Sequence, residues 1–387
     1  MKNFEPATQD VNAVVGGYLR DLAYAQGTQP KMFGYKRAAA AILGLETSLV
    51  DLVREHDNAL PRIPGIGPAS ARVILEVLDS GGSPTVERAI DASGRREDIE
   101  RRRSLRGHFL SRAEVLRILA DPILGGPTLD LYLGDLQMHS EWSDGSPTVA
   151  AIARACRARG YRYAAVTDHS HGLKIAGGMS MQEAAEQRLA IDAVNAEYGD
   201  AFRLLHGVEA NIGIDGDLDL LTTEAAAFDI VLAAPHSRLR KNDDQTQRML
   251  RTLEHSAVRI LAHPRGRITG SRAGVIAEWE RVFTQAARRG IAVEIDGDPS
   301  RQDVDYALAR QALDAGCLFA LDSDAHTTNQ LAYAETAIAH ARLAGIPADR
   351  IVNCWTVDRL LAWIAEPMRE AASMDGARPT LNGVPRR

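Results

Sequence analysis

Seven short apolar runs alternate with longer amphipathic stretches between residues 129 and 321, and this rhythm constrains the fold more than any other feature of the chain. Short apolar runs are typical of buried strands, and the stretches between them have the length and periodicity of helices. A long series of βα units commonly closes on itself, so the sequence predicts an α/β fold with a parallel barrel or near-barrel. The expected strands are Leu131–Met138, Tyr163–Thr167, Phe202–Val208, Ile230–Ala234, Val258–Ala262, Ala292–Ile295 and Leu318–Leu321. The expected helices include Pro147–Arg159, Met181–Glu197, Gln245–His255, Gly274–Arg289 and Asp303–Ala315.

The first 90 residues have a different pattern, with apolar residues at helical spacing and few β-branched clusters. They predict a small all-α domain over 1–90, with helices in Val11–Tyr24, Gly34–Leu43 and Ser48–Glu55. Residues 91–128 contain the charge run Arg95–Arg103, which predicts a charged, partly helical linker. The barrel is then expected over 129–365. The tail 366–387 is rich in Pro, Gly, Arg and Ala and is predicted to be disordered.

The composition excludes several classes of protein. The 387 residues carry 51 acidic and 45 basic side chains, a net charge of −6, which argues against coating nucleic acid through bulk charge. Cys156, Cys317 and Cys354 are far apart and form no CxxC pair, so neither a disulfide framework nor a cysteine zinc site is expected. No apolar run approaches the roughly 20 residues of a membrane-spanning helix, and the N-terminus shows no secretory signal. We therefore expect a cytoplasmic protein without a membrane partner.

Histidine, aspartate and glutamate follow most of the expected strands. The set consists of Gln137, His139, Asp144, Asp168, His169, Glu209, His236, His263, Asp324 and His326. Strand ends of a βα barrel converge on one mouth, so these distant residues would meet in space. Imidazole nitrogens and carboxylate oxygens suit Zn, Mn or Fe, and the set is too large for a single ion. The sequence thus predicts two or three divalent metal ions.

A single histidine at a strand end is more often a hydrogen-bonded structural residue than a ligand. Five histidines in the same context favour a metal site. Histidines without that context are expected to be structural or on the surface: His56, His108, His206, His255 and His340. His171 stays open between a supporting or substrate-contacting role and none.

The strand-end motifs resemble the PHP (polymerase and histidinol phosphatase) domain over about residues 130–365. The motifs are Asp135–Gly145, Thr167–His169, Gly207–Glu209, Pro235–Ser237, Ala262–Pro264 and Asp324–His326. The resemblance implies a distorted seven-stranded barrel with a trinuclear metal site that hydrolyses phosphate esters. It implies as ligands His139, Asp144, His169, Glu209, His236, His263, Asp324 and His326.

One position departs from the family pattern. The family usually opens with His-x-His, whereas this chain has Gln137 as the first member, a neutral and weaker ligand. We still place Gln137 among the candidate ligands, and the departure puts the affinity of one metal in doubt. Asp168, His169 and Asp324 are the candidate catalytic residues. Asp322, Glu294 and Asp296 are candidates for orienting the ligands.

The amino-terminal part resembles the helix-hairpin-helix domain of bacterial family X DNA polymerases. The turn Gly65-Ile66-Gly67 opens a helix, and such a turn can bind a DNA phosphate through backbone N–H groups. The alternative is a plain helical hairpin. The family's lyase lysine would fall at Val73, so we expect no Schiff-base chemistry there. Only about 40 residues separate this part from the barrel, without an Asp-x-Asp motif, so the polymerase palm is missing and nucleotide addition is not expected.

Basic residues near the strand ends are candidates for binding the phosphate of a substrate. Arg is suited to this role because its planar fork binds phosphate with two hydrogen bonds. The candidates are Arg238, Arg248, Arg265 and Arg267, with Lys241 and Arg272 nearby. Surface charge is the alternative for each of them. Trp142 could stack on a base or pack in the core.

Three functions remain open on the sequence alone. The first is a metal-dependent DNA 3′-5′ exonuclease or 3′-end-processing enzyme in repair. The second is a phosphatase for a small ester of the histidinol phosphate type. The third is a DNA-binding adaptor that lost activity through Gln137. Two segments that each resemble parts of one polymerase family favour DNA ends as the partner, whereas the oligomeric state cannot be read from the sequence.

Overall fold

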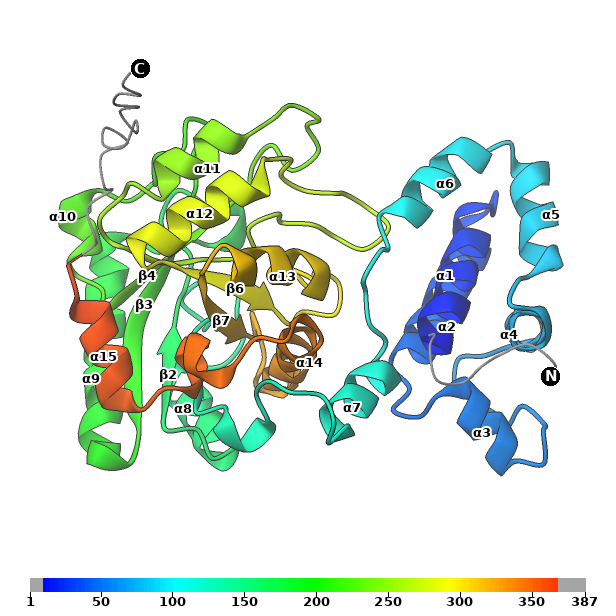
Figure 1. Ribbon diagram of the computed structural model, residues 1–387, viewed down its shortest axis with the longest axis horizontal. Coiled ribbons are helices and arrows are strands. Elements are labelled where there is room, and N and C mark those ends of the chain that lie inside the picture. The colour runs from blue at the N-terminus through cyan, green and yellow to red at the C-terminus, as the bar shows by residue number, and fades with distance from the viewer. Residues whose placement is uncertain (1–9, 368–387) are drawn as a thin grey trace, which may run out of the picture.

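A barrel and a smaller helical part lie side by side in the computed structural model, which describes residues 10–367 (Figure 1). The helical part holds the first elements of the chain, and the barrel holds the remainder. The predicted disordered tail falls almost wholly outside the described residues, from position 368 onward. No helix within residues 10–367 is both long enough and apolar enough to cross a membrane.

Seven parallel strands pair in chain order, each with its sequence neighbour, which confirms the predicted α/β barrel. The strands are β1 Gly134–Asp135, β2 Tyr163–Val166, β3 Arg203–Asn211, β4 Ile230–Ala234, β5 Val258–Leu261, β6 Ala292–Asp296 and β7 Leu318–Asp322. A single parallel bridge, Met138 to Ala325, joins the β1 and β7 sides of the barrel. The barrel is therefore nearly closed, with its seam between the first and last strands.

The seam explains why β1 is much shorter than the predicted run Leu131–Met138. The Leu136 N–H donates to the Asp322 carboxylate over 2.7 Å, and the Leu133 N–H donates to the Asn353 carbonyl over 2.8 Å. The N–H groups of Leu133 and Leu136, which could otherwise extend the strand, thus donate to a loop carbonyl and to a side chain. Residues 129–131, predicted as the strand's beginning, form a short 3₁₀ turn.

Helices cover the outside of the barrel and follow the strands. They are α8 Val149–Ala158, α9 Met181–Tyr198, α10 Thr222–Ala225, α11 Thr246–Thr252, α12 Trp279–Arg289, α13 Tyr306–Asp314, α14 Ala334–Ala344 and α15 Val357–Ala365. Side chains at their starts accept backbone N–H bonds, as Thr148, Ser180 and Asp305 do.

Helix α12 begins five residues later than the predicted Gly274–Arg289. Gly274 has a positive φ of 84°, and a Cβ there would lie 1.9 Å from the Arg265 carbonyl oxygen. The next residues are extended: the Val275 N–H donates to the Arg265 carbonyl over 2.7 Å, and Ile276 forms a bridge with Asp244. This pairing with neighbouring loops takes the place of the first helical turn.

Helix α15 closes the bottom of the barrel. Trp355 and Trp363 pack with interior side chains of the strands, including Leu205, Leu232 and Ile260. The Tyr163 hydroxyl, also in this group, donates to the carbonyls of Val352 and Trp355 at 3.0 and 3.1 Å. A second apolar layer lies between the strands and the outer helices. The end opposite α15 is left for the polar strand ends.

The helical part has its own apolar core. Its helices are α1 Val11–Tyr24, α2 Gln29–Leu43, α3 Leu49–Glu55, α4 Pro68–Ser80 and α5 Pro84–Ser93. Buried residues from all five helices meet in this core, among them Leu19, Ile42, Leu49, Val73 and Ile90. The amphipathic spacing of these helices gives each one apolar face, and burying that face holds the part together.

The interval 91–128 contains two further helices, α6 Arg96–Ser104 and α7 Arg112–Ala120. Ile99 of α6 is buried in the core of the helical part. Arg103, from the charge run, pairs with the buried Asp21 of α1 at 2.6 Å. The charge run is thus packed against the helical part, whereas α7 packs on α14 of the barrel through Val115 and Ile118.

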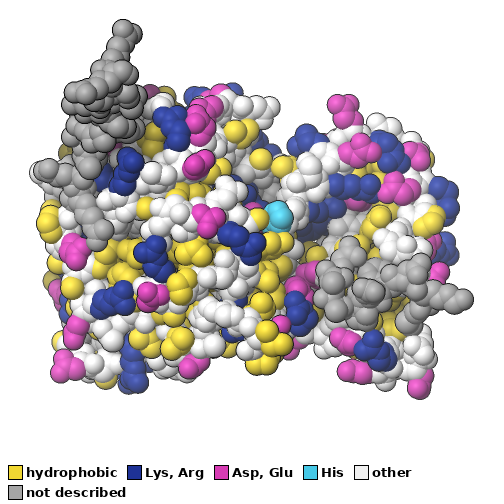
Figure 2. Space-filling view, viewed as in Figure 1, with side chains coloured by type: hydrophobic (Ala, Val, Ile, Leu, Met, Phe, Trp, Pro, Cys, Tyr) yellow, Lys and Arg dark blue, Asp and Glu magenta, His cyan; other side chains and the backbone are white. Residues whose placement is uncertain are grey.

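Several hydrogen bonds join the segment between α6 and α7 to the barrel. Gln302 exchanges two hydrogen bonds with the backbone of Leu110, at 2.8 and 2.9 Å. The Arg267 guanidinium donates to the Gly107 carbonyl over 3.2 Å. On the outer face shown in Figure 2, acidic and basic side chains are intermixed over both parts, consistent with the modest net charge.

Candidate metal centre at the barrel mouth

Glu209 lies at the centre of the polar cluster. It sits inside β3, one of the longest strands, and its carboxylate is fully buried. One oxygen, Oε1, lies 2.8 Å from His263 Nε2 and 3.3 Å from His236 Nε2. The other, Oε2, lies 3.0 Å from His169 Nδ1 and 3.3 Å from His139 Nε2. Four histidines from four different strand ends therefore converge on one carboxylate.

A second carboxylate, Asp324, lies just past the end of β7. Its Oδ1 is 3.1 Å from His139 Nε2, and its Oδ2 is 3.3 Å from the Nε of Arg301. Asp324 is buried and has a positive φ of 52°, a backbone conformation that is uncommon for aspartate. The turn after β7 thus aims this carboxylate back toward His139.

The third group is nearer to solvent. Asp144 Oδ1 lies 3.3 Å from His326 Nε2 and 3.5 Å from His169 Nε2, and its side chain is 37% exposed. The His139 ring stacks between the rings of His169 and His326, at centroid distances of 4.5 and 4.4 Å. The site is therefore deepest at Glu209 and opens toward Asp144 and His326.

The electrostatics of the cluster favour a cation. Burial opposes protonation of His169, but the carboxylates of Glu209 and Asp144 outweigh it and raise its pKa to about 10. Burial likewise opposes protonation of His326, and Asp144 then raises its pKa to about 9. For Glu209, the surrounding histidines overcome burial and hold the carboxyl pKa well below its usual range. The carboxylates are thus ionised, and their field attracts positive charge.

The donor atoms fit divalent metal ions. Three overlapping groups bring their ligand atoms within 4.8 Å of one another: His139, Asp144, His169 and His326; His169, Glu209 and His236; and His139, Glu209 and Asp324. The buried Nδ1 atoms of His139 and His263 have no hydrogen-bond partner. Polar atoms buried without partners are costly in a folded protein. Three groups that share members are what a multinuclear site of nitrogen and oxygen ligands requires.

Three of the residues predicted for this site are outside the three groups. His263 is one of them, although its Nε2 lies 2.8 Å from Glu209 Oε1. Asp168 is not in any of the three groups: its carboxylate accepts hydrogen bonds from Ser140 N at 2.8 Å and from Gln187 Nε2 at 2.6 Å. The hydroxyls of Ser140 and Ser143 also donate to it, so the carboxylate accepts from four groups. Asp168 therefore shapes the loop after β1 and supports its neighbour His169, and the structure does not place it on the reacting atoms.

Gln137 is buried beside Glu294 of β6 and is likewise absent from the three groups. With its amide nitrogen turned toward Glu294, the amide donates to Oε2 over 3.0 Å and to Oε1 as well. Burial and the nearby Asp322 and Asp296 raise the pKa of the Glu294 carboxyl well above its usual value. Glu294, Asp296 and Asp322 thus form a buried layer of carboxylates beneath the histidines, as expected for residues that orient ligands.

The four candidate phosphate-binding arginines are all occupied by other partners. Arg265 pairs with Asp303 at 3.0 Å and with Asp305 at 2.7 Å, and Arg267 pairs with Asp305 at 3.0 Å. Arg248 is buried and donates to the backbone carbonyls of residues 212, 213 and 237. Arg238 pairs with Asp243 on the surface. These contacts assign Arg248, Arg265 and Arg267 to holding loops together.

Arg301 is the cation that the sequence reasoning missed. Its side chain is 23% exposed and lies in the loop after β6, beside both Asp324 and Asp296. The sequence does carry a signal for Arg301, because it follows the strand-end carboxylate Asp296 by five positions, whereas the predicted arginines all follow β4 or β5. His171 lies 3.8 Å from Glu224 and is 43% exposed, and Trp142 packs partly against the outer core.

The turn that contains Gly65 and Gly67 lies between α3 and α4, and both glycines are exposed. Gly65 has a positive φ of 82°, which favours glycine, and Gly67 precedes α4 with Pro68 at its first position. Ile63 and Ile66 face the core of the helical part and anchor the turn. A groove of about 540 Å³ runs past the turn and is lined by Lys31, Arg37, Gly65, Gly67 and Ser70, among others. Val73 is fully buried in the core.

The parallel barrel and the overlapping groups of histidines and carboxylates at its strand ends resemble those of PHP-type metal-dependent phosphoesterases. Comparison with known proteins confirms this resemblance. The chain is 35% identical over 232 residues to the DNA polymerase/3′-5′ exonuclease PolX of Bacillus subtilis (strain 168), covering 60% of this chain and 40% of that protein. It is 28% identical over 234 residues to a probable phosphatase of Enterobacter sp. (strain 638), covering 58% of this chain and 90% of that protein.

The chain thus spans less than half of the Bacillus protein, although it spans most of the Enterobacter one. No family model matches the chain. Among solved structures, the histidinol phosphate phosphatase of Lactococcus lactis, complexed with zinc, L-histidinol and phosphate, superposes with a TM-score of 0.40 at 17% identity. The superposed residues cover 54% of this chain and 94% of that structure. A likeness at this level carries no conclusion about substrate.

Proposed function

We propose that this protein hydrolyses phosphate esters at a centre of two or three divalent metal ions held at the barrel mouth. The observation that carries the proposal is the convergence of His139, His169, His236 and His263 on Glu209. The ligand set would be completed by Asp144, Asp324 and His326. Bound divalent ions would supply a Lewis-acidic centre and a water molecule of lowered pKa.

The chain's own residues would bind and orient the ester. Arg301 pairs with Asp324 of the cluster itself and is partly exposed, so it would contact a phosphate oxygen that approaches Asp324. The buried carboxylates Glu294, Asp296 and Asp322 would fix the orientation of the ligand loops, because each lies in a strand under the cluster. Asp144 and His326 lie at the open side, where an ester can enter.

DNA ends are the substrate that we favour, with 3′-5′ exonuclease or 3′-end processing as the reaction. The hairpin turn supports this choice, because Gly65 and Gly67 leave backbone N–H groups exposed in a groove that also holds Lys31 and Arg37. Such a groove suits a sugar-phosphate backbone. The Bacillus relative, named as a 3′-5′ exonuclease, agrees with this reaction.

A small phosphate monoester is the second candidate. The relatives that support it are the probable phosphatases, such as those of Enterobacter and Proteus mirabilis, of which this chain covers 90%. In that case the hairpin turn would serve only the packing of the helical part. A non-catalytic DNA-binding adaptor is the third reading.

A paired assay with Mn²⁺ separates these candidates. Purified full-length protein is given end-labelled DNA with 3′-hydroxyl or 3′-phosphate ends, and separately histidinol phosphate. His326→Ala, which removes a proposed ligand, is run as the control for contaminating nucleases. Release from DNA that is lost in the control supports the first proposal, and release from the small ester alone supports the second. DNA binding without hydrolysis of either substrate would overturn the enzyme proposal.

The DNA-contacting turn has its own test. Lys31→Glu together with Arg37→Glu reverses the charge of the groove without altering a buried residue. We expect the apparent KM for DNA to rise at least tenfold, because phosphate contacts carry most non-specific affinity. Turnover of histidinol phosphate should not change. Equal loss with both substrates would contradict a DNA role for the groove.

A further inference from the structure

A second cavity lies between the helical part and the barrel, away from the histidine cluster. It encloses about 560 Å³ and is lined by α1, α2 and α7, by the segment between α6 and α7, and by barrel loops. Small-molecule sites have volumes of about 300–1,000 Å³, so the cavity is large enough for a small organic ligand. The proposed hydrolysis does not use it.

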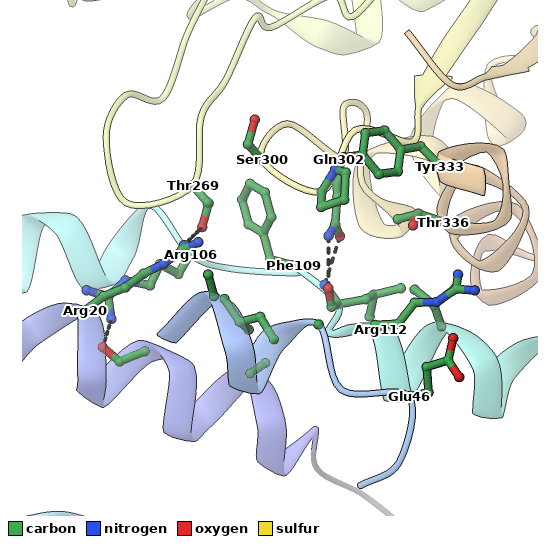
Figure 3. A pocket seen from close by; sticks show the side chains of 18 of the residues that line it. Arg20, Glu46, Arg106, Phe109, Arg112, Thr269, Ser300, Gln302, Tyr333 and Thr336 are labelled. Carbon is green, nitrogen blue, oxygen red and sulfur yellow. Dashed lines mark hydrogen bonds between the residues drawn. The ribbon is translucent and has the colours of Figure 1, made fainter. Parts of the chain in front are cut away.

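One end of the cavity is positively charged. Arg20 and Arg106 lie there together, as Figure 3 shows. Arg106 is neutralised by Asp21, which also pairs with Arg103. Arg20 has no carboxylate partner in residues 10–367, and its one side-chain hydrogen bond runs to the Thr269 hydroxyl at 3.0 Å. Burial and the neighbouring Arg106 lower the pKa of Arg20, as expected for a cation without a counter-charge.

The other end of the cavity contains negative charge, and the cavity also has an apolar lining. Arg112 pairs with Glu335 at 2.6 Å, and Glu46 lies beside it, so this end already has negative charge (Figure 3). The ring of Phe109 lies between the two ends (Figure 3), and the apolar side chains of Leu43 and Val115 also line the cavity. A ligand that fits this distribution has a compact anionic group and an apolar body, with the anion at Arg20.

The cavity is connected to the metal centre through one loop. Pro299, Ser300 and Gln302 line the cavity, whereas Arg301 between them contacts Asp324 of the centre. Thr269 links the two sides, because its hydroxyl accepts from Arg20 and its N–H donates to the Ser300 carbonyl over 2.9 Å. Arg20 on α1 is therefore two hydrogen bonds away from the residue that precedes Arg301.

We propose that this cavity binds a small organic anion with an apolar ring, held at its charged group by Arg20, and that the bound ligand restrains the loop 297–303 and with it Arg301. A phosphate, sulfonate or carboxylate on an aromatic body has this chemistry. The site would report the presence of such an anion to the barrel mouth. The proposal does not depend on which ester the barrel hydrolyses.

Fluorescence titration of the full-length protein with 1-anilinonaphthalene-8-sulfonate tests the site. We expect saturable binding that weakens at least tenfold in Arg20→Gln and is recovered largely in Arg20→Lys. Ala40→Trp should abolish it, because Ala40 is an exposed helical residue at the cavity and a larger side chain would fill the space. Ala92→Trp, on the exposed face of α5, is the matched control and should bind like the unaltered protein.

His326→Ala separates the cavity from the barrel mouth, since binding in the cavity should be unaffected by it. Wild-type affinity in both Arg20→Gln and Ala40→Trp would overturn the site, as would the absence of saturable binding. Hydrogen exchange then tests the connection. Amides of residues 297–303 should exchange several-fold more slowly with the probe bound, and unchanged exchange would overturn the coupling to Arg301.

Discussion

His263 Nε2 lies 2.8 Å from Glu209 Oε1, and the opposite nitrogen of the same ring is buried without a partner. The His263 N–H of the backbone donates to the buried Glu294 carboxylate over 2.6 Å. His263 is therefore held by two carboxylates: Glu209 of β3 contacts its ring, and Glu294 of β6 accepts from its backbone. This arrangement makes Glu209 the residue on which the rest of the candidate centre depends.

Replacing Glu209 should remove bound metal. Glu209→Gln keeps the size of the side chain but takes away the charge that four histidines face. We expect metal affinity to fall at least about tenfold, and metal content after dialysis to fall below half of the unaltered protein's. Elemental analysis measures this directly. Glu197→Gln, on the exposed side of α9, is the control, and equal metal content in both variants would contradict the assignment.

Chelation should destabilise the barrel. Ligands that bind only the folded state stabilise it by about 2.7 kcal/mol at a concentration of 100 Kd. For a domain of this size, 1 kcal/mol corresponds to about 2–4 °C in Tm, so we expect EDTA to lower Tm by about 5–10 °C. Calorimetry with and without EDTA, followed by addition of Mn²⁺ or Zn²⁺, measures the shift. An unchanged Tm would mean that the cluster holds no metal ion that stabilises the folded barrel.

A substitution of Gln137 tests whether this residue is a metal ligand or supports the neighbouring Glu294. If its amide serves Glu294, as the contacts indicate, Gln137→Ala should retain most of the bound metal while lowering the free energy of unfolding by about 1–3 kcal/mol. A true ligand would show the reverse, a loss of metal with little loss of stability. Metal analysis and urea unfolding of the same preparation separate these results. Glu294→Ala, which removes the acceptor of this hydrogen bond, should cause a loss of stability that is at least as large.

Arg265 should matter for stability rather than for substrate affinity. Its guanidinium neutralises Asp303 and Asp305, which are both buried. Removing one partner of a buried pair costs about 3–5 kcal/mol, so Arg265→Ala should unfold at markedly lower urea concentration. Arg251→Ala breaks an exposed pair with Asp217 and should change stability by less than about 1 kcal/mol. A raised KM with normal stability would restore Arg265 as a substrate contact.

His340 should contribute to acid sensitivity. Burial, together with Arg267, lowers its pKa to about 3, and its ring bonds to Tyr306 N at 3.1 Å and to Gln302 at 2.8 Å. The neighbouring charged groups are Arg265, Asp305 and His108. The unfolded chain binds a proton at His340 near pH 6.5 and the folded protein does not, so stability falls as pH drops from about 6.5 toward 3. Above about pH 6.5 the His340 ring is neutral in both the folded and the unfolded state, so this loss of stability is absent.

Urea unfolding at pH 7 and pH 5 checks this sign. The loss of stability between the two pH values should be smaller in His340→Gln than in the unaltered protein, by about 2 kcal/mol. Histidines of the metal cluster contribute to the acid sensitivity of both proteins and therefore cancel in the comparison. Identical pH dependence would show that His340 titrates normally in the folded state.

The barrel could be predicted from sequence because its strands are buried on both faces. Such strands appear as continuous apolar runs, and β4 was predicted with the bounds that it has, Ile230–Ala234. The bounds of the first strand could not be predicted, because the N–H groups of Leu133 and Leu136 on either side of it donate to the Asn353 carbonyl and the Asp322 side chain, which are distant in sequence. Local pattern carries no information about those partners.

The candidate site, like the barrel, could be predicted from the sequence only in part. Histidines at strand ends were identified because barrel topology alone brings them together. The sequence predicts chemical roles for Asp168 and Arg265 because they lie within two positions of His169 and His263. Side-chain direction decides their roles instead: Asp168 faces Ser140 and Gln187, and Arg265 faces Asp303. Which way a side chain turns at a strand end depends on packing that a sequence pattern does not contain.

The position of α15 has a consequence for the order in which the barrel is completed. Trp355 and Trp363 join the interior from a segment that follows all seven strands in the chain. During synthesis the strands therefore leave the ribosome before the side chains that fill the bottom of their interior. Until these two indoles arrive, Leu205, Leu232 and Ile260 lack part of their packing. The nascent barrel thus passes through a stage in which its floor is open to water and to chaperones.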